Sequence, residues 1–576
     1  MAKQIRNLTN DVMSLSNKNY TGLYHKSIVI PPSGTVTVSD SDYAGFGYLN
    51  PQLFQVTTVS DQTTQLIIED LTAAGYGGTG GGGLIVITDG GTLSGTYQGS
   101  VIVEGEGLGS ATITGDIIVY GSLWCQNLTN SGGYSVEVYG DLLISGNGNF
   151  TPSDPTSNQG LIIVHGSFRY GYFEMKINPD KYPYLYVYGD LISLDDDFIA
   201  YGQDGAQGLG MWIAGNAMVN YMDLHGGDAT ATHYAGSGGS LGVGGNLITY
   251  DGLDLYGGSS SYNGQSANNG GQIWCAGHCM AYINAYGGSS SANASAGDGN
   301  YISIAGTLSC WWLNNSGGDC ASTDPTHYAG YAGNVYAGQI VGDGQIFSNG
   351  GHRTGTLTAE PTSLTQAPNG GYIESYGDLH AARVIAYGGA NDAVSPLGVS
   401  NSTGGQGGQV FVYGDTVVWR YRLYGGSAHG QSGGNGGYLT VKGRISAERQ
   451  IDCSGGSSDL VNGSPSWIIA KGGLLTSEVT LLDGQGTGSV TTNGCGLQLG
   501  GSVNIATLNQ CDRTGSNIQP FMNNKILLTV GSMPTKKTLT QPNSTNTQDV
   551  SAYLGTSVFL YDSVAGWNVL TGTSLA

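Results

Sequence analysis

The chain is built from one unit that is written many times and closes on a pair of glycines. Two copies show the pattern, GGQIWCAGHCMAYINAYGGSS at 270–290 and GGQVFVYGDTVVWRYRLYGGS at 407–427. Each copy also has a central glycine, and the commonest steps between central glycines are 29 to 32 residues, as at 245, 277 and 306. So short a unit cannot bury an apolar face alone. The repeat therefore predicts a solenoid whose stacked units share a continuous core.

The pattern inside each unit has a period of two. Ile273 and Cys275 alternate with Gln272 and Trp274, which is typical of a strand with one buried face. The apolar runs are short, rich in β-branched residues and bounded by glycine, so helices of ten or more residues have no place. Stacked rungs of two or three such strands predict an all-β, parallel β-helix with rungs of about 29 residues.

The repeat also predicts local features. The central and closing glycines are expected at corners that need a positive φ. The stretch LYGGSSSYNGQSANNGG at 255–271 is interpreted as a corner and a long loop between rungs, not as a linker. Tyrosines recur at two places in the unit and should stack into ladders: Tyr139, Tyr188, Tyr376 and Tyr413 before the central glycine, and Tyr256, Tyr286, Tyr387 and Tyr424 before the closing pair.

Composition excludes several classes of protein. Glycine makes up 100 of the 576 residues, but 39% are hydrophobic, which is too many for a disordered chain, and only 15 are proline, which argues against collagen. A formal net charge of −22, with 19 Lys and Arg, gives no electrostatic footprint for nucleic acid or an anionic membrane. No apolar run has the length of a membrane span, and the first residues lack the apolar core of a signal peptide.

The eight cysteines are interpreted as small buried hydrophobic residues. A chain without a signal peptide is expected to fold in a cytoplasm, where thiols stay reduced. Cys275 and Cys279 have no matching second pair, so the spacings fit no zinc site. We therefore expect no metal and no cofactor.

The repeat fades at both ends and suggests four parts. These are an N-terminal module at 1–72, a Gly-rich hinge at 73–84, the parallel β-helix at 85–512 and a C-terminal β cap at 513–576. In the first part, Ile5, Leu8, Val12 and Leu15 keep a three-four spacing, which fits either a short coiled-coil segment or simple packing.

Carboxylates and tryptophans are the candidate functional residues. Two carboxylates held about 5 to 9 Å apart can cleave a glycosidic bond. The catalytic candidates are Asp195, Asp197, Asp223 and Asp254. The alternative is that these side chains are only solvated at the corners of the rungs. Tryptophan side chains offer flat surfaces on which sugar rings can stack. The candidate glycan-binding residues are Trp274, Trp311, Trp312 and Trp419, and the alternative is that they only pack between rungs. For Arg420, Arg422, Glu448 and Arg449, a salt-bridge ladder between rungs is favoured over an active site.

The rungs of the form GxxxVYGDL…YGGS, the N-terminus without a signal peptide and the C-terminal string VFLYDSVAGWNVL resemble tailed-bacteriophage appendage proteins, that is, tail spikes, tail fibres and head fibres. The resemblance implies a right-handed β-helix, a homotrimer, an N-terminal module that attaches to other virion proteins, and a β-helix that meets host-surface glycans. The sequence shows no clear carboxylate pair of the kind that cleaving spikes carry.

The expected function is therefore that of a virion structural protein, a spike, fibre or capsid-bound appendage that is assembled in the host cytoplasm and binds host glycans without cleaving them. A polysaccharide depolymerase is the first alternative, and a solenoid adhesin of a bacterial surface is the second.

Overall fold

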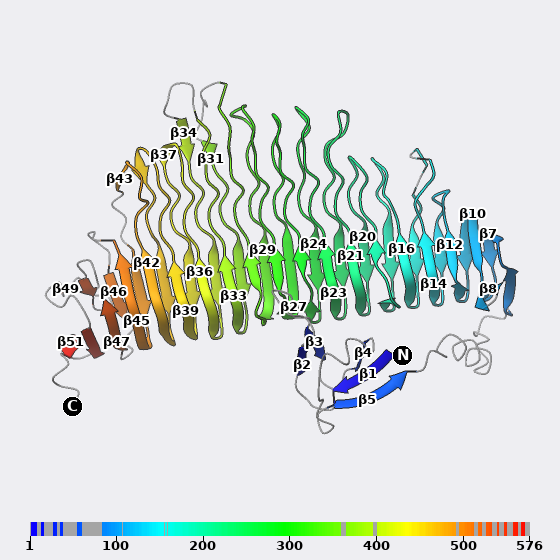
Figure 1. Cartoon of the computed structure of the whole chain (residues 1–576), viewed down its shortest axis with the longest axis horizontal. Coiled ribbons are helices and arrows are strands. Elements are labelled where there is room, and N and C mark those ends of the chain that lie inside the picture. Colours follow the sequence, from blue (N-terminus) through cyan, green and yellow to red (C-terminus); the bar gives the residue numbers. More distant parts are fainter. Residues whose placement is uncertain are drawn as a thin grey trace.

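The computed structural model describes residues 83–511, except 106, 155, 158, 359–364, 395–399 and 491–494, and individual strands on either side of this range. Every regular element in this part is a β-strand, and most strands join one sheet of 41 strands. Within the stack of rungs, equivalent strands of adjacent rungs pair in parallel, as β35 (Gln409–Val412) does with β38 (Tyr438–Val441). The predicted all-β parallel solenoid is thus confirmed. Figure 1 shows the strands stacked along the length of the molecule, with long extended segments on one side of them.

One rung shows how the repeat builds this fold. β35 (Gln409–Val412) forms the first side, and β36 (Thr416–Arg422) forms the next two because its pairing register shifts between Val418 and Arg420. Each rung thus contributes to three stacked parallel ladders, which we call the first, second and third sheets. β35 lies in the first sheet, Thr416–Val418 in the second and Arg420–Arg422 in the third.

The remaining strands of the stack follow this plan. The first sheet also contains β13 (Val136–Val138), β15 (Ile162–Val164), β17 (Tyr184–Val187), β20 (Gly210–Ile213), β22 (Ser240–Val243), β24 (Gln272–Cys275), β32 (Tyr372–Ser375), β38 (Tyr438–Val441), β41 (Trp467–Ala470), β44 (Gly496–Leu499) and β46 (Asn517–Pro520). Strands that bend from one sheet into another are β10 (Ser110–Val119), β14 (Leu142–Asn149), β16 (Phe168–Glu174), β21 (Ala217–Asp223), β23 (Leu247–Asp254), β27 (Tyr301–Ser309), β29 (Asn334–Ile340), β33 (Leu379–Ile385), β39 (Arg444–Asp452), β42 (Gly473–Leu481) and β45 (Gly501–Gln510).

Shorter strands complete individual rungs. β11 (Leu123–Cys125), β18 (Leu191–Ser193) and β25 (Cys279–Met280) belong to the second sheet, and β12 (Asn127–Thr129), β19 (Phe198–Ile199), β26 (Ile283–Asn284), β28 (Trp312–Asn314) and β30 (Gln345–Phe347) to the third. The stack begins with β6 (Ile85–Thr88), β7 (Gly91–Tyr97), β8 (Val101–Gly105) and β9 (Gly107–Leu108).

The core lies inside the rungs, as the period of two predicts. Ile273 and Cys275 are fully buried, whereas Gln272 and Trp274 point outward. One continuous apolar cluster runs from Leu93 to Val530, so each rung buries the face that its neighbours leave open. All eight cysteines are buried, which agrees with their interpretation as small hydrophobic residues.

The extended segments are paired arms. In one rung the ascending arm leaves the third sheet after Asp254, and the returning arm reaches the first sheet at Gly271 (Figure 1). The arms bond to each other through backbone groups: Gly258 N donates to Gly236 O, Asn268 N to Gly258 O and Gly288 N to Asn268 O. This alternation of ascending and returning arms recurs along the stack, so the arms form a second hydrogen-bonded layer. The predicted corner and loop at 255–271 thus lie between β23 and β24 as expected, and their arms bond to the arms of the neighbouring rungs.

The repeated glycines are required by close approach and not by backbone dihedral angles. A Cβ on Gly258 would lie 1.9 Å from Gly227 O, and one on the central Gly277 would lie 2.6 Å from Gly245 O. None of the central or closing glycines of the repeat has a φ in the left-handed range. The predicted positive φ is thus wrong at these positions, since it is the spacing of neighbouring backbones that leaves no room for a side chain.

Aromatic ladders between rungs are confirmed. Tyr120, Tyr139, His165 and Tyr188 stack in sequence, with ring centroids 4.4 to 5.2 Å apart. On the ascending arms His225, Tyr256 and Tyr286 stack nearly parallel, and Tyr387 stacks on Tyr424. Tyr376 and Tyr413 also contact each other, at 5.5 Å.

At the tips of the arms a small ladder joins the loops. It contains β31 (Thr365–Gln366), β34 (Ser400–Thr403), β37 (Gly430–Ser432), β40 (Val461–Asn462) and β43 (Ser489–Val490). Isolated parallel bridges continue this pairing toward the N-terminal rungs, from Ser458 back to Ser260. The tips are therefore ordered by backbone pairing as well.

Different strand pairings occur toward the chain ends. β1 (Ala2–Asn7) pairs antiparallel with β4 (Thr35–Val38) and β5 (Phe54–Val59), and β2 (Met13–Ser16) with β3 (Ser27–Ile30). Ile5 and Leu15 thus lie in strands, so the coiled-coil interpretation is wrong for them; Leu8 and Val12 lie outside the described residues. The predicted hinge at 73–84 also lies outside them, except for its last two residues.

At the C-terminal end, parallel pairing continues to β47 (Ile526–Ser532) and β48 (Thr538–Thr540). β50 (Ser557–Asp562) then pairs antiparallel with β47, β51 (Gly566–Leu570) with β50, and β49 (Thr547–Asp549) with β48. The antiparallel strands occupy a sheet edge that would otherwise be open to another chain.

Candidate functional site

The outer face of the first sheet carries a strip of aromatic side chains. In it Tyr301, Tyr336, Tyr372 and Phe411 form one run, with successive ring centroids 5.1 to 5.5 Å apart. Further exposed aromatic residues on the same sheet are Tyr184, Trp212, Trp274 and Tyr438. They project outward because outward positions alternate with core positions along each strand. We call this set the aromatic strip.

Two indoles of the strip stack across a missing side chain. Trp212, Gly242 and Trp274 occupy equivalent places on β20, β22 and β24. Because Gly242 has no side chain, the two indoles lean over it and stack with ring centroids 5.3 Å apart. About two fifths of each tryptophan stays exposed, 39% for Trp212 and 43% for Trp274, so the stacked pair presents an apolar surface to solvent.

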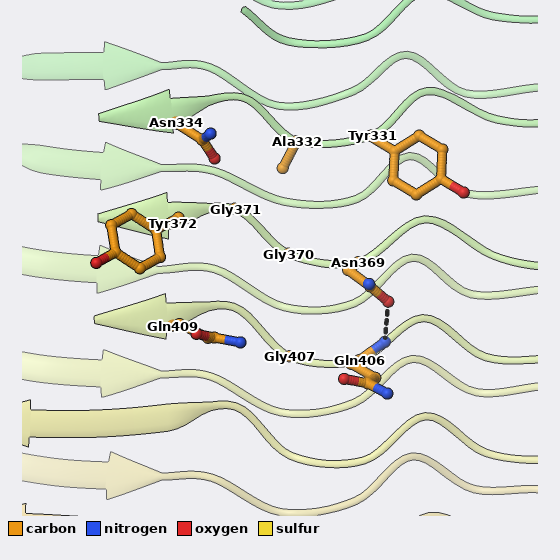
Figure 2. Close-up of a pocket in the computed structure, with 10 residues that line it drawn as sticks. All are labelled: Tyr331, Ala332, Asn334, Asn369, Gly370, Gly371, Tyr372, Gln406, Gly407 and Gln409. Atoms are coloured by element: carbon orange, nitrogen blue, oxygen red, sulfur yellow. Dashed lines mark hydrogen bonds between the residues drawn. The ribbon is translucent and has the colours of Figure 1, made fainter. Parts of the chain in front are cut away.

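A shallow pocket of about 170 Å³ adjoins the strip where the returning arms enter the first sheet. Figure 2 shows Tyr372 at one side of the pocket and Tyr331 at the other, with Asn369 and Gln406 on the same side as Tyr331. Asn369 Oδ1 accepts a hydrogen bond of 2.8 Å from Gln406 N, which fixes the pocket floor. Its lining contains amides and phenols and no charged side chain.

Several polar groups of this pocket are available to a ligand. The side-chain amides of Asn334, Gln406 and Gln409 make no hydrogen bond within the described part of the chain. Tyr372 donates its hydroxyl to Glu374 Oε2 at 3.0 Å, and burial and this carboxylate raise the pKa of the phenol. Amides offer both donors and acceptors, which matches the hydroxyl groups of a sugar.

The four carboxylates named from the sequence lie near the third sheet and its junction with the second. Asp223 and Asp254 are register partners on adjacent strands, so the structure brings these two together. Asp254 accepts hydrogen bonds from Tyr221 Oη at 2.6 Å and Asn284 Nδ2 at 2.8 Å. Asp223 Oδ1 lies 2.6 Å from His225 Nδ1.

Asp195 and Asp197 occupy the bend between the second and third sheets. Asp195 is exposed, and Asp197 accepts a hydrogen bond of 2.9 Å from Asn220 Nδ2. Burial raises the pKa of Asp197, and the charges of Asp196 and Asp251 add to this effect. Among the described residues no cluster of three or more His, Cys, Asp or Glu side chains suits a metal ion.

The tryptophans named from the sequence do not form one surface. Trp274 belongs to the aromatic strip. Trp312 lies in the third sheet, where its ring is tilted by 43° against Phe347 at a centroid distance of 4.6 Å, and it donates to Asn284 Oδ1. Trp311, which is 39% exposed, directly precedes it. Trp419 stands at the same bend as these residues on a later rung, surrounded by arginines.

The salt-bridge ladder predicted for Arg420, Arg422, Glu448 and Arg449 is wrong. No ion pair within the described residues contains an arginine. The guanidinium groups of Arg420 and Arg449 instead lie 4.6 and 5.2 Å from the ring centre of Trp419. The bend accounts for this difference, because it places Arg420 opposite Gln450 and leaves Glu448 exposed at the corner.

Most of the aromatic strip was missed in the sequence, although a signal for it exists. Its members occupy both outward positions of the aligned units, Tyr184, Tyr301, Tyr372 and Tyr438 the first and Trp212, Trp274, Tyr336 and Phe411 the second, so a tally of these two positions would have shown the strip. The pocket had no such signal, because its lining comes from three rungs and their three returning arms.

Comparison with protein-family models, curated proteins and solved structures found no match to this chain. The described residues contain no helix with the length and apolar character of a membrane span.

Proposed function

We propose that this chain is a bacteriophage virion appendage, a spike, fibre or capsid-bound protein, whose first sheet binds glycans of the host surface without cleaving them. The observation that carries the binding role is the aromatic strip with its uncharged, amide-lined pocket. Aromatic faces stack on the apolar faces of sugar rings, while free amides and phenols bind the hydroxyl groups.

The place in a virion rests on the resemblance of the rungs and C-terminal string to phage appendages. On this proposal the stack is a right-handed β-helix, three copies associate as a homotrimer, and the N-terminal module attaches to other virion proteins. A long stack of rungs suits this role because it repeats similar binding positions along one rigid face.

Binding without cleavage is proposed because the paired carboxylates have other partners. Both oxygens of Asp254 accept hydrogen bonds, and Asp223 is held by His225. A cleaving site needs one carboxyl group as acid and a second group as base or nucleophile, both free to reach the glycosidic bond.

The test measures attachment of the purified full-length protein to host cells, together with release of reducing sugar from their capsule. Trp274→Ala should reduce attachment at least about tenfold, since stacking on an aromatic residue is lost. Tyr262→Ala is the matched control, because Tyr262 is also 43% exposed but lies in an arm loop away from the first sheet. It should attach normally.

Release of reducing sugar that Asp254→Asn abolishes would replace this proposal with the depolymerase alternative. Equal attachment by Trp274→Ala and Tyr262→Ala would show that the aromatic strip does not bind the host.

A further inference from the structure

Arginines gather at the bend between the second and third sheets, on three consecutive rungs. Arg383 comes from β33, Arg420 and Arg422 from β36, and Arg449 from β39. The guanidinium carbons of Arg383, Arg420 and Arg449 lie 4.7, 4.6 and 5.2 Å from the ring centre of Trp419. One indole thus holds guanidinium groups from its own rung, the preceding rung and the following rung. We call these four arginines and Trp419 the arginine cluster.

The charges of the cluster are poorly balanced. Arg383 and Arg420 are register partners, and like charges directly opposite on adjacent strands repel each other. Arg383 donates only a long hydrogen bond of 3.4 Å, to the neutral Gln345. Asp452 is the register partner of Arg422 and of no other arginine in the cluster. Within the described part of the chain no carboxylate lies within ion-pair distance of these arginines.

Arg420 is the centre of this imbalance. Its residue is only 8% exposed, and its Nε has no hydrogen-bond partner. Burial lowers the pKa of its guanidinium, and so do the charges of Arg422, Arg449 and Arg383. An arginine still remains protonated in a protein, so it cannot escape the repulsion by losing its proton. A buried donor without an acceptor also costs free energy.

We propose that the arginine cluster is a binding site for an oxyanion, namely the carboxylate or phosphate substituent of an acidic glycan. This proposal rests on the glycan-binding function proposed above and adds the charge of the substrate and a second surface. The planar guanidinium fork matches the two oxygens of a carboxylate or phosphate, and the indole holds the guanidinium groups in place.

The size of the cluster favours a single substituent over a long polyanion. Neighbouring strands lie about 4.8 Å apart, so three rungs span roughly 10 Å. The chain as a whole, with 41 acidic and 19 basic residues, repels an extended polyanion such as nucleic acid. Asp452 and Glu448 beside the cluster also limit the positive patch to these rungs.

Calorimetric titration of the full-length protein tests the proposal with three probes: inorganic phosphate, trigalacturonic acid and fully methyl-esterified trigalacturonate. The ester has the same sugars without the negative charges. The variant Arg449→Gln is compared with Arg444→Gln. Arg444 lies on the same strand and is exposed, so its replacement removes the same charge outside the cluster. At least one anionic probe should bind, Arg449→Gln should weaken that binding about tenfold, and Arg444→Gln should change it less than twofold.

Binding of phosphate alone would assign a phosphate-bearing glycan as the source, and binding of trigalacturonate alone a uronate. Arg383→Gln gives the same test if Arg449→Gln does not fold. The proposal is overturned if neither anion binds, if the methyl ester binds as well as the acid, or if Arg449→Gln and Arg444→Gln weaken binding equally. Trp274→Ala should leave this titration unchanged, because Trp274 lies outside the arginine cluster. Loss of host attachment in Trp274→Ala and loss of anion binding in Arg449→Gln therefore report on separate surfaces.

Discussion

Trp212 and Trp274 stack on each other with ring centroids 5.3 Å apart, although the rung that carries Gly242 lies between them. Two rungs are about 9.6 Å apart, so the indoles meet only by leaning over the glycine from both sides. Gly242 therefore determines how these two indoles lie on the first sheet.

Replacing Gly242 with valine should separate the two indoles. A Cβ at this position would lie 2.3 Å from Trp212 Cε3, so overpacking should destabilise the protein by about 1–3 kcal/mol. The near-ultraviolet circular dichroism of the stacked pair should weaken, and host attachment should fall with it. Thr440→Val is the control, because Thr440 lies in the same outward row between Phe411 and Ile469. An unchanged spectrum in Gly242→Val would contradict this account of the indole pair.

The arms predict two different costs for glycine substitution. Gly258→Ala places a methyl group 1.9 Å from Gly227 O, so backbone hydrogen bonds of the arms must break, at a cost of at least about 3 kcal/mol. Gly264 has a φ of 77° and open space around its Cβ position, so Gly264→Ala should cost only the left-handed strain of about 1–2 kcal/mol. Urea unfolding of both variants measures the difference, and equal midpoints would show that the arms do not pack as described.

The buried cysteines should be unreactive in the folded protein. Burial raises the pKa of Cys125 and of Cys310 to about 12. Only the thiolate reacts with iodoacetamide, so at pH 8 about one thiol in ten thousand is reactive at each site. Mass spectrometry should find no alkylation of these cysteines without urea and complete alkylation in it. Rapid native labelling of Cys310 would mean that the rungs open at this point.

Asp197 should make stability depend on pH in a defined direction. The pKa of Asp197 in the folded protein is raised above 3.8, so the folded protein binds the carboxyl proton more tightly than the unfolded chain does. The free energy of unfolding therefore falls as the pH rises from the unfolded pKa to the folded pKa. Asp197→Asn should therefore be more stable than the wild type at pH 7 and equal to it at pH 3. The difference at pH 7 should be small, since solvent screens this half-buried group.

Chemical denaturation at both pH values checks this result, with the exposed neighbour Asp195→Asn as the control. If Asp197→Asn were less stable at pH 7, its carboxylate would be stabilising the fold through Asn220 and not penalising it through burial.

The sequence by itself determined the rungs. The period of two assigned Ile273 and Cys275 to the core and Trp274 to the surface, because alternation along a strand is a local property of the backbone. The fixed spacing of the tyrosines likewise determined the ladders, since equivalent positions of stacked repeats must lie above one another.

Only the tertiary structure decided what the glycines and the arginines do. The distance between arms, and not the φ of any residue, excludes side chains at Gly258, and that distance does not exist within one unit. The bend places Trp419 between Arg383 and Arg449 and leaves Glu448 at the corner, because one rung has an extra residue there. Such a shift changes which side chains meet across rungs, and it depends on how neighbouring backbones pair.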